Sequence, residues 1–321
     1  MLILRGVNFG CVFVGAGTLN FFGQGWPWHK FAKLIPGFDF TGATFVSKTI
    51  TLNPQKGNMP LKNNFQPVEF FPRCIKVNFL KAVAVNAVAL SGPGAKALLE
   101  TKKWQGLARP FFISFMAIEP TKEKRLQETK GFVDLLKKYL PGFKSKIGLE
   151  INVSCPNTKH DPKKLAEEAI DYLDAASALN IPLVIKVNAL MSDETARSIE
   201  DSGLCDALTI SNTIPWDEVP EKIRIKCFGS AESPLKKYGF GNGGFSGRPV
   251  LPMVLEKILG LRDFGITLPI IGGGGITRPE DVVAFSAAGA DAISFATASM
   301  VRPWNVRPII RVSHQFLGGD R

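Results

Sequence analysis

Short runs of apolar residues recur along the chain, and each is followed by a polar or glycine-rich turn. The runs are CVFVGAGT (11–18), ATFVSKT (43–49), AVAVNAV (82–88), FFISFMAI (111–118), GLEINVSC (148–155), LVIKVNAL (183–190), ALTISNT (207–213), LPIIGGGGI (268–276) and AISFATAS (292–299). Their apolar residues are largely continuous instead of alternating with polar ones, which is typical of strands covered on both faces. The pattern predicts buried parallel strands.

Amphipathic stretches with helix start signals lie between these runs. One has apolar residues at Leu165, Ala169, Leu173, Ala176 and Leu179. A spacing of three or four residues places them on one helix face. Asp161-Pro162 ahead of this stretch supplies a capping residue and a first-turn proline. Thr277 and Glu280 predict a capping box for a second helix that continues to Ala288.

Strand and helix patterns alternate about eight times, and no Pro/Ser-rich linker divides the chain. This order favours an α/β fold of the (β/α)8 TIM barrel type over an open doubly wound sheet. Two segments exceed the minimal barrel. Residues 54–77 are expected to form a hairpin or excursion. The Pro/Gly-rich residues 215–249 are long enough to form a functional loop or lid. We expect residues 1–321 to form a single barrel domain with these insertions at its C-terminal face.

Composition narrows the class of protein. The 321 residues are 45% hydrophobic and 21% charged, which allows a sizeable core. Five widely spaced cysteines without a CxxC pair argue against a disulfide framework or a metal cluster, and three dispersed histidines argue against a metal triad. No apolar run approaches the ~20 residues of a membrane span, and the first residues do not resemble a signal peptide. We expect a cytoplasmic protein that binds no metal and no membrane.

The net charge of +11 raises the question of a nucleic-acid partner. The lysines are scattered through stretches such as TKEKRLQETK (121–130) and DPKKL (161–165) and do not form one block. This distribution is typical of a solvated basic surface that also favours anionic small ligands. Nucleic acid is therefore not the expected partner.

Polar residues collect at the carboxyl ends of the predicted strands, where the reactive groups of a barrel lie. They are Lys48, Asn86, Asn152, Cys155, Asn157, Lys186, Asn212 and Thr213. An amide offers both a donor and an acceptor without adding charge, so the set suits a planar, polar ring. Single asparagines commonly serve turns, and a single cysteine is commonly inert in a core. The position of Cys155 on a loop after a strand favours reactivity instead. Cys11, Cys74, Cys205 and Cys227 are expected to be structural.

The last two strands carry a phosphate signature. The signature is the stretch IIGGGGITRPEDV (270–282). Its glycines have no side chains, so the backbone could approach an anion closely, and the helix that follows would supply free N–H groups. FATAS (295–299) ends the next strand. Barrels commonly bind phosphate with the loops after strands seven and eight.

With these residues in hand, the chain resembles the dihydroorotate dehydrogenase family from about Gly15 to Pro303. The motifs that carry the resemblance are INVSCPNT (151–158), FVSKTITL (45–52), VNAVAL (85–90), VIKVN (184–188), ISNT (210–213), GGFSGRPV (243–250) and GGGGITRPEDV (272–282), in the family's order and spacing. The resemblance implies a (β/α)8 barrel with FMN at its top. It also implies an oxidoreductase of pyrimidine biosynthesis that converts dihydroorotate to orotate.

The resemblance further implies a role for each matching residue. Cys155 would be the catalytic base that removes the C5 proton while C6 gives hydride to the flavin, and Lys48 would lie between substrate and flavin. Lys186 would lie at the flavin's N1/C2 edge. The implied substrate-binding residues are Lys48, Asn86, Val88, Leu90, Asn152, Asn157, Asn212 and Thr213. The implied cofactor-binding residues are Gly17, Lys48, Thr49, Asn152, Lys186, Ser211, Gly247, Gly274, Gly275, Ala296 and Thr297.

Cysteine as the base is typical of the family's soluble class (class 1). Members of that class use fumarate as acceptor or transfer electrons through an iron–sulfur flavoprotein subunit, and a homodimer is expected. The chain departs from the usual family residues at Gly17, Ala89, Gly92 and Ala296. The segment NFFGQGWPWHKFAKLIPGF (20–38) has no counterpart in the family pattern.

Two other readings stay open on the sequence. A tRNA dihydrouridine synthase is also an FMN barrel with a cysteine after a strand, but its motif has Gly-Cys-Pro where this chain has Ser154-Cys155-Pro156. The other reading is a reductase of another pyrimidine, or a non-catalytic flavin-binding barrel.

Overall fold

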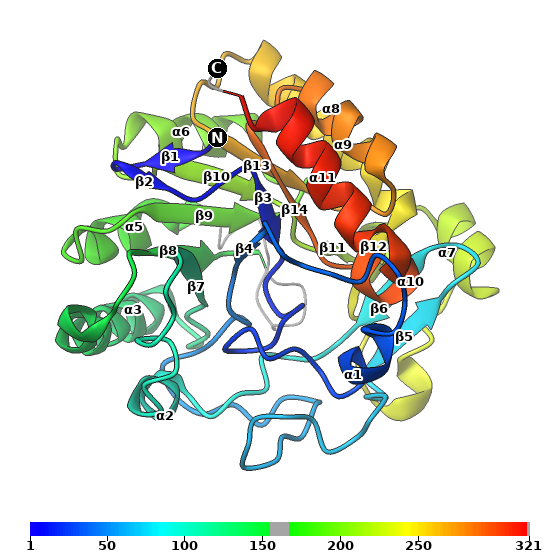
Figure 1. Ribbon diagram of the computed structural model, residues 1–321, viewed down its shortest axis with the longest axis horizontal. Coiled ribbons are helices and arrows are strands. Elements are labelled where there is room, and N and C mark those ends of the chain that lie inside the picture. Colours follow the sequence, from blue (N-terminus) through cyan, green and yellow to red (C-terminus); the bar gives the residue numbers. More distant parts are fainter. Residues whose placement is uncertain (155–166, 320–321) are drawn as a thin grey trace.

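The computed structural model of the protein describes residues 1–154 and 167–319. Parallel strands form one eight-stranded sheet in the order β4-β3-β14-β13-β10-β9-β8-β7 (Figure 1). They are β3 (Val12–Val14), β4 (Thr44–Phe45), β7 (Phe111–Phe115), β8 (Ile147–Asn152), β9 (Leu183–Val187), β10 (Ala207–Ile210), β13 (Ile270–Gly273) and β14 (Ala292–Phe295). Bridges from Val46 to Phe112 and from Ile50 to Phe115 join the chain after β4 to β7, so the sheet nearly closes. The predicted (β/α)8 barrel is confirmed.

Helices surround this sheet (Figure 1). The longer ones are α2 (Ala95–Glu100), α3 (Lys122–Tyr139), α5 (Ala169–Ser177), α6 (Asp193–Asp201), α7 (Glu221–Phe228), α8 (Leu251–Asp263), α9 (Pro279–Ala287) and α11 (Val306–Leu317). Single turns form α1 (His29–Ala32) and α10 (Ala298–Val301), and 3-10 helices span Leu140–Gly142, Trp216–Glu218, Lys236–Tyr238, Arg248–Val250 and Pro303–Asn305. None of the helices in the described ranges is long and apolar enough to cross a membrane.

The helix predicted from the apolar spacing after residue 161 is confirmed in its described part. Helix α5 buries Ala169, Leu173 and Ala176, and Leu179 just beyond it is also buried. These side chains belong to the main core between helices and sheet. Leu165 and the predicted start signal at Asp161-Pro162 lie outside the described residues.

One predicted barrel strand belongs to a different sheet. The run AVAVNAV contains β6 (Val83–Asn86), which pairs antiparallel with β5 (Ile75–Asn78) and with β12 (Gly244–Gly247). With β11 (Ile214–Pro215) they form a sheet ordered β11-β12-β6-β5. The prediction of a parallel barrel strand at 82–88 was therefore wrong. The two segments that exceeded the minimal barrel, 54–77 and 215–249, contain β12 and overlap β5 and β11.

An N-terminal hairpin fills the amino-terminal end of the barrel. Strands β1 (Ile3–Leu4) and β2 (Val7–Asn8) pair antiparallel. Leu2, Leu4 and Phe9 are buried and form one cluster with residues that point into the barrel from its strands. Arg5 anchors the hairpin because its Nε donates to both carboxylate oxygens of Asp206, at 3.0 and 2.9 Å. The opposite, carboxyl end of the barrel is left for a ligand.

Candidate active site

A cavity of about 240 Å³ lies between the carboxyl ends of the barrel strands and the second sheet. The second sheet contributes Ala84 and Asn86 from β6 and Phe245 and Ser246 from β12. The predicted site residues that line the cavity are Gly17, Lys48, Thr49, Asn86, Val88, Leu90, Asn152, Lys186, Ser211, Asn212, Thr213, Gly274, Gly275, Ala296 and Thr297. The fold thus brings together residues that are up to 280 positions apart in the sequence (Gly17 to Thr297).

Three predicted site residues are not among the lining residues. Cys155 and Asn157 lie outside the described residues. Gly247 ends β12 with φ 107°, and a Cβ there would lie 2.3 Å from the carbonyl oxygen of Ala82. Its glycine is explained by the close approach of β12 to the chain before β6, while its neighbour Ser246 reaches the cavity. A ligand contact by Gly247 stays a prediction.

Amide and hydroxyl groups at the strand ends form a hydrogen-bonded network. Asn212 Nδ2 donates to Asn152 Oδ1 at 2.7 Å and to Ser154 Oγ at 2.9 Å. Asn152 Nδ2 donates to Thr49 Oγ1 at 3.5 Å, and Thr49 in turn contacts Ser114 Oγ at 2.9 Å. These side chains are buried, so each bond fixes the orientation of a donor or acceptor before a ligand enters.

Lys48 is buried where the chain leaves β4. It is 6% exposed, and its Nζ donates to the carbonyl of Ser91 at 2.7 Å and lies 5.2 Å from the ring centre of Phe21. Ser91 also ties its own loop down, because its hydroxyl accepts from the amide of Met59 and donates to the carbonyl of Val88. A cation is thereby held against the loop that follows β6.

Lys186 brings a second buried cation to the cavity wall. It lies on β9, opposite Asn152 in the β8–β9 register. Its Nζ is 3.6 Å from Glu150 Oε1, and the two side chains are 7% and 6% exposed. A positive charge here, beside neutral amides, suits a ligand that carries or develops negative charge.

The glycines after β13 let the chain turn tightly against α8. Gly274 and Gly275 have φ 110° and 83°, and a Cβ on Gly275 would lie 2.6 Å from Leu251 Cβ. The cavity wall here is therefore backbone, joined by the hydroxyls of Thr297 and Ser246, which lie 3.2 Å apart. Backbone and hydroxyl groups of this kind suit a phosphate.

The capping prediction for the next helix was wrong in its residues. Helix α9 begins after Arg278, and the carboxylate of Asp281 accepts from the amides of Thr277 and Arg278 at 2.8 and 2.9 Å. Asp281, not Glu280, is thus the acidic partner, and it also pairs with Arg248. Because Asp281 uses these two amides, they are not the free N–H groups expected for an anion.

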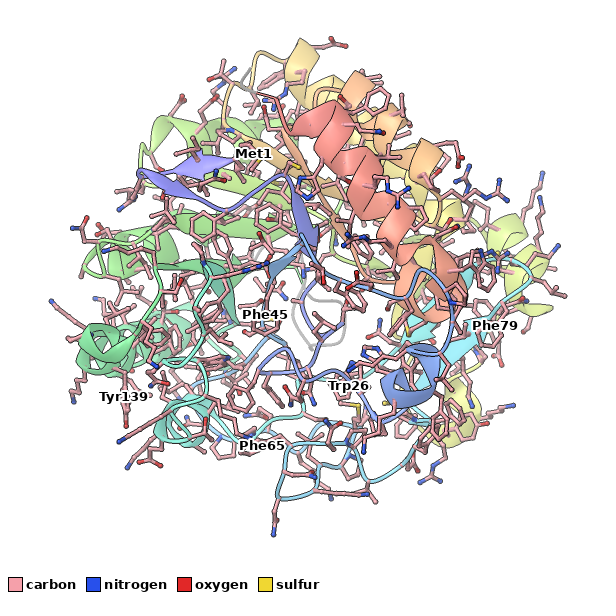
Figure 2. All side chains as sticks on the ribbon, viewed as in Figure 1. Met1, Trp26, Phe45, Phe65, Phe79 and Tyr139 are labelled. Atoms are coloured by element: carbon pink, nitrogen blue, oxygen red, sulfur yellow. The ribbon has the colours of Figure 1, made fainter. Side chains whose placement is uncertain are left out.

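Several apolar lining residues were not predicted. They are Trp26, Trp28, Met59, Ile75, Phe245 and Met300. Trp26 donates from Nε1 to the carbonyl of Gly17 at 2.8 Å, which fixes the 20–38 segment against the start of the cavity. Figure 2 shows Trp26 beside α1 and toward the centre of the view, while Phe79 and Tyr139 lie at opposite edges. The two tryptophans that flank Pro27 were the sequence feature that could have indicated this apolar part of the wall.

The four remaining cysteines lie outside the cavity lining. Cys11, Cys74, Cys205 and Cys227 are buried free thiols. Burial raises the pKa of Cys74 to about 11 and that of Cys205 to about 12. Such thiols are poor nucleophiles and bases near neutral pH.

Comparisons with known proteins agree with the resemblance. The family model described as dihydroorotate dehydrogenase matches residues 29–316. A relative from Endomicrobium trichonymphae, named dihydroorotate dehydrogenase B (NAD(+)), catalytic subunit, is 30% identical over 308 residues, which cover 93% of this chain and 85% of the relative. A Solibacter usitatus relative, whose name gives dihydroorotate dehydrogenase A (fumarate), is 28% identical over 298 residues, or 89% of this chain and 84% of the relative.

A solved structure shares the fold. The crystal structure of a ligand-free type DHODH from Eimeria tenella superposes with a TM-score of 0.68 at 21% identity, over 99% of this chain and 87% of the other. At this identity the likeness shows the fold alone.

Proposed function

The chain belongs to the dihydroorotate dehydrogenase family, and on that premise we propose that it oxidises dihydroorotate to orotate with FMN, a step of de novo pyrimidine biosynthesis. The observation that carries the proposal is the match to residues 29–316, together with one cavity that gathers the predicted polar residues other than Cys155 and Asn157. The same match favours this reaction over the reduction of tRNA. We further propose that residues 1–321 act as one cytoplasmic barrel domain and form a homodimer.

The family is flavin-dependent, and the residues of this cavity fit FMN. The phosphate would bind at Gly274, Gly275 and Thr297, where the wall is backbone and hydroxyl. The ring system would lie along Lys186, where a buried ammonium favours the added electrons of the reduced cofactor. When bound, FMN supplies the acceptor for the hydride of the substrate. The further cofactor contacts proposed are Gly17, Lys48, Thr49, Asn152, Ser211, Gly247 and Ala296.

The substrate would occupy the side of the cavity nearest Lys48 and the amide network. Asn86, Asn152 and Asn212 offer donors and acceptors that match the edges of a dihydropyrimidine ring. The buried ammonium of Lys48 would bind the carboxylate of dihydroorotate or an adjacent oxygen. Val88, Leu90 and Thr213 complete the proposed substrate wall, and Asn157 is a further proposed contact.

Cys155 is the proposed general base, on its sequence position alone. Its thiolate takes the proton from C5 while the hydride leaves C6, so that the C5–C6 double bond of orotate forms. Asn152 and Asn212 hold the ring in place during this step, and Lys186 stabilises the charge delivered to the cofactor side of the cavity. Only the thiolate accepts a proton, so the rate depends on the ionisation of the thiol.

Two electron acceptors are proposed. An iron–sulfur flavoprotein subunit that passes electrons to NAD is supported by the name of the Endomicrobium trichonymphae relative, and fumarate by that of the Solibacter usitatus relative. An acceptor assay with fumarate alone separates them. Turnover with fumarate in the absence of a second protein would exclude a required subunit.

The proposal is tested by purifying the protein, releasing its flavin by heat and following anaerobic flavin reduction by dihydroorotate. We expect FMN and a reduction rate that rises with pH through the range near ~8.5 where free thiols ionise. Cys155→Ala should slow reduction by about 100-fold or more and remove the rise, the scale of a lost general base. Cys227→Ala, a buried thiol outside the cavity lining, is the control. FAD in place of FMN, or an unchanged rate in Cys155→Ala, would contradict the proposal.

A further inference from the structure

A layer of side chains separates the cavity from the apolar end of the barrel. Each of the eight barrel strands, or the residue just after it, contributes one member: Phe13, Val46, Phe112, Glu150, Val184, Thr209, Ile271 and Ser294. They enclose a void of about 10 Å³. Of these eight residues, Glu150 alone carries a charge, and it lies on the same strand as Asn152, two positions earlier.

Glu150 is a buried acid with few local partners. It is 4% exposed, and its Oε1 has no hydrogen-bond partner. Its ion-pair partner is Lys186, whose Nζ lies 3.6 Å from that oxygen, beyond hydrogen-bond length but within ion-pair distance. A carboxylate stays charged in such a place only beside a compensating cation, because removal from water is costly.

Stability does not explain an acid at this position. Replacing a buried ion pair by apolar side chains is often neutral or stabilising, and five neighbours in the layer are apolar. The pair therefore indicates that the charge of Glu150 acts on a ligand in the cavity, whose wall includes Lys186. The carboxylate lies in the layer beneath, so its charge reaches a bound ligand together with that of Lys186.

We propose that Glu150 is the positioning residue and counter-charge of Lys186, and that it lowers the reduction potential of the bound flavin. The inference rests on the proposed function, because it needs a flavin in the cavity. Lys186 alone would favour the anionic reduced flavin, and the negative charge of Glu150 opposes part of that effect. The fold thereby sets how readily the reduced cofactor gives up electrons to the acceptor.

The test is the midpoint potential of the bound flavin in Glu150→Gln, which keeps the shape of the side chain and removes its charge. We expect the ratio of reduced to oxidised flavin at a given potential to rise about tenfold, which is ~30 mV for a two-electron couple. The affinity of the oxidised flavin for sulfite should also rise several-fold, since the adduct is anionic. An unchanged or lower potential would overturn the inference.

Three further variants separate charge from packing. Glu150→Asp, which keeps the charge, should stay close to the wild-type potential, and so should Thr209→Val, a neutral change in the same layer. In a Lys186→Met background, Glu150→Gln should shift the potential much less, because Glu150 acts on the flavin through the position and charge of Lys186. A full shift in that background, or a shift in Thr209→Val, would refute action through Lys186.

Flavin content and melting temperature are measured for every variant. Wild-type protein that binds no flavin would refute the proposed function before Glu150 is tested. Wild-type protein that binds and reduces FMN, with an unchanged potential in Glu150→Gln, would refute only the counter-charge role.

Discussion

Ala89 and Leu90, two neighbouring residues of the cavity wall, have left-handed backbone conformations with φ 53° and 57°. A residue with a Cβ pays roughly 1–2 kcal/mol in this region. Glycine, which has no Cβ, has no such cost. The loop after β6 thus keeps a strained conformation next to the proposed substrate, and the hydrogen bonds of Ser91 hold it there.

Ala89→Gly should therefore stabilise the protein. Relief of the backbone cost exceeds the roughly 0.4–1 kcal/mol of extra unfolded-state entropy that glycine adds, so the free energy of unfolding should rise by up to about 1 kcal/mol. Ala87→Gly is the matched control: Ala87 is buried and is not among the residues with positive φ. The free energy of unfolding of Ala87→Gly should be lower than that of the wild type by about 1–2 kcal/mol. Urea unfolding measures both, and equal losses would show that residue 89 is unstrained.

At the scale of single residues, the predictions from the sequence include most of the polar residues of the cavity wall, but of its large apolar side chains they include only Val88 and Leu90. Lys48 and Lys186 were identifiable because each ends or interrupts an apolar run, where a charge is unexpected. Trp26 and Trp28 come from a long connection without periodicity, so no pattern indicated which way their side chains point. Their place in the wall depends on contacts with distant residues, such as the carbonyl of Gly17.

At the scale of elements, apolar runs identified strands reliably but not their partners. The run around β6 resembles the barrel strands in composition, yet it pairs with β12, about 160 residues later. Periodicity is local, whereas sheet membership depends on which distant segment offers free backbone groups. The same limit explains the capping error at α9: Thr277, Glu280 and Asp281 are all suitable, and the pairing of Asp281 with Arg248 is a tertiary contact.

Helix α1 offers a pH-dependent test of its packing. His29 is 4% exposed, its ring lies 4.1 Å from that of Trp28 and 5.1 Å from that of Phe38, and its Nε2 has no hydrogen-bond partner. Burial, with a smaller contribution from the charge of Lys33, lowers its pKa to about 4. The imidazole is therefore neutral in the folded protein at pH 7.

The pKa of His29 in the folded protein lies below its pKa in the unfolded chain. At pH values between these two pKa values, the unfolded state therefore binds one proton more than the folded state. The contribution of the neutral ring to the free energy of unfolding is fully present above about pH 6.5 and is lost as the pH falls toward 4. When the pH is lowered from 7.5 to 5, the free energy of unfolding of the wild type should fall by about 2 kcal/mol more than that of His29→Phe, whose side chain cannot take up a proton. Urea unfolding at both pH values gives this difference. Parallel losses in the two proteins would mean that His29 is solvated.

At the scale of the whole molecule, polarity changes along the barrel axis. The hairpin β1–β2 and its neighbours fill one end with Leu2, Leu4 and Phe9. The layer with Glu150 follows, and the amides and lysines of the cavity come last. The apolar end stabilises the barrel, and the carboxyl end is available for chemistry. Anchoring of the hairpin should therefore affect stability and leave the proposed flavin site intact.

Asp206 joins the hairpin to the barrel in two ways that substitutions can separate. Its carboxylate accepts from Arg5 and, through Oδ2, from the amide of Leu183 at 2.7 Å at the start of β9. Arg5→Ala removes only a partly exposed ion pair and should cost at most about 1 kcal/mol. Asp206→Ala also leaves the buried Leu183 amide without its acceptor and should cost about 2 kcal/mol or more.

Asp206→Asn decides between the two contributions, since its side-chain oxygen still accepts from the Leu183 amide while the charge is gone. We expect its free energy of unfolding to match that of Arg5→Ala, with flavin content and reduction rate unchanged in all three variants. If Asp206→Asn instead loses as much as Asp206→Ala, the ion pair to Arg5 is the main anchor. The hairpin would then depend on charge, and its stability should fall further as salt is added.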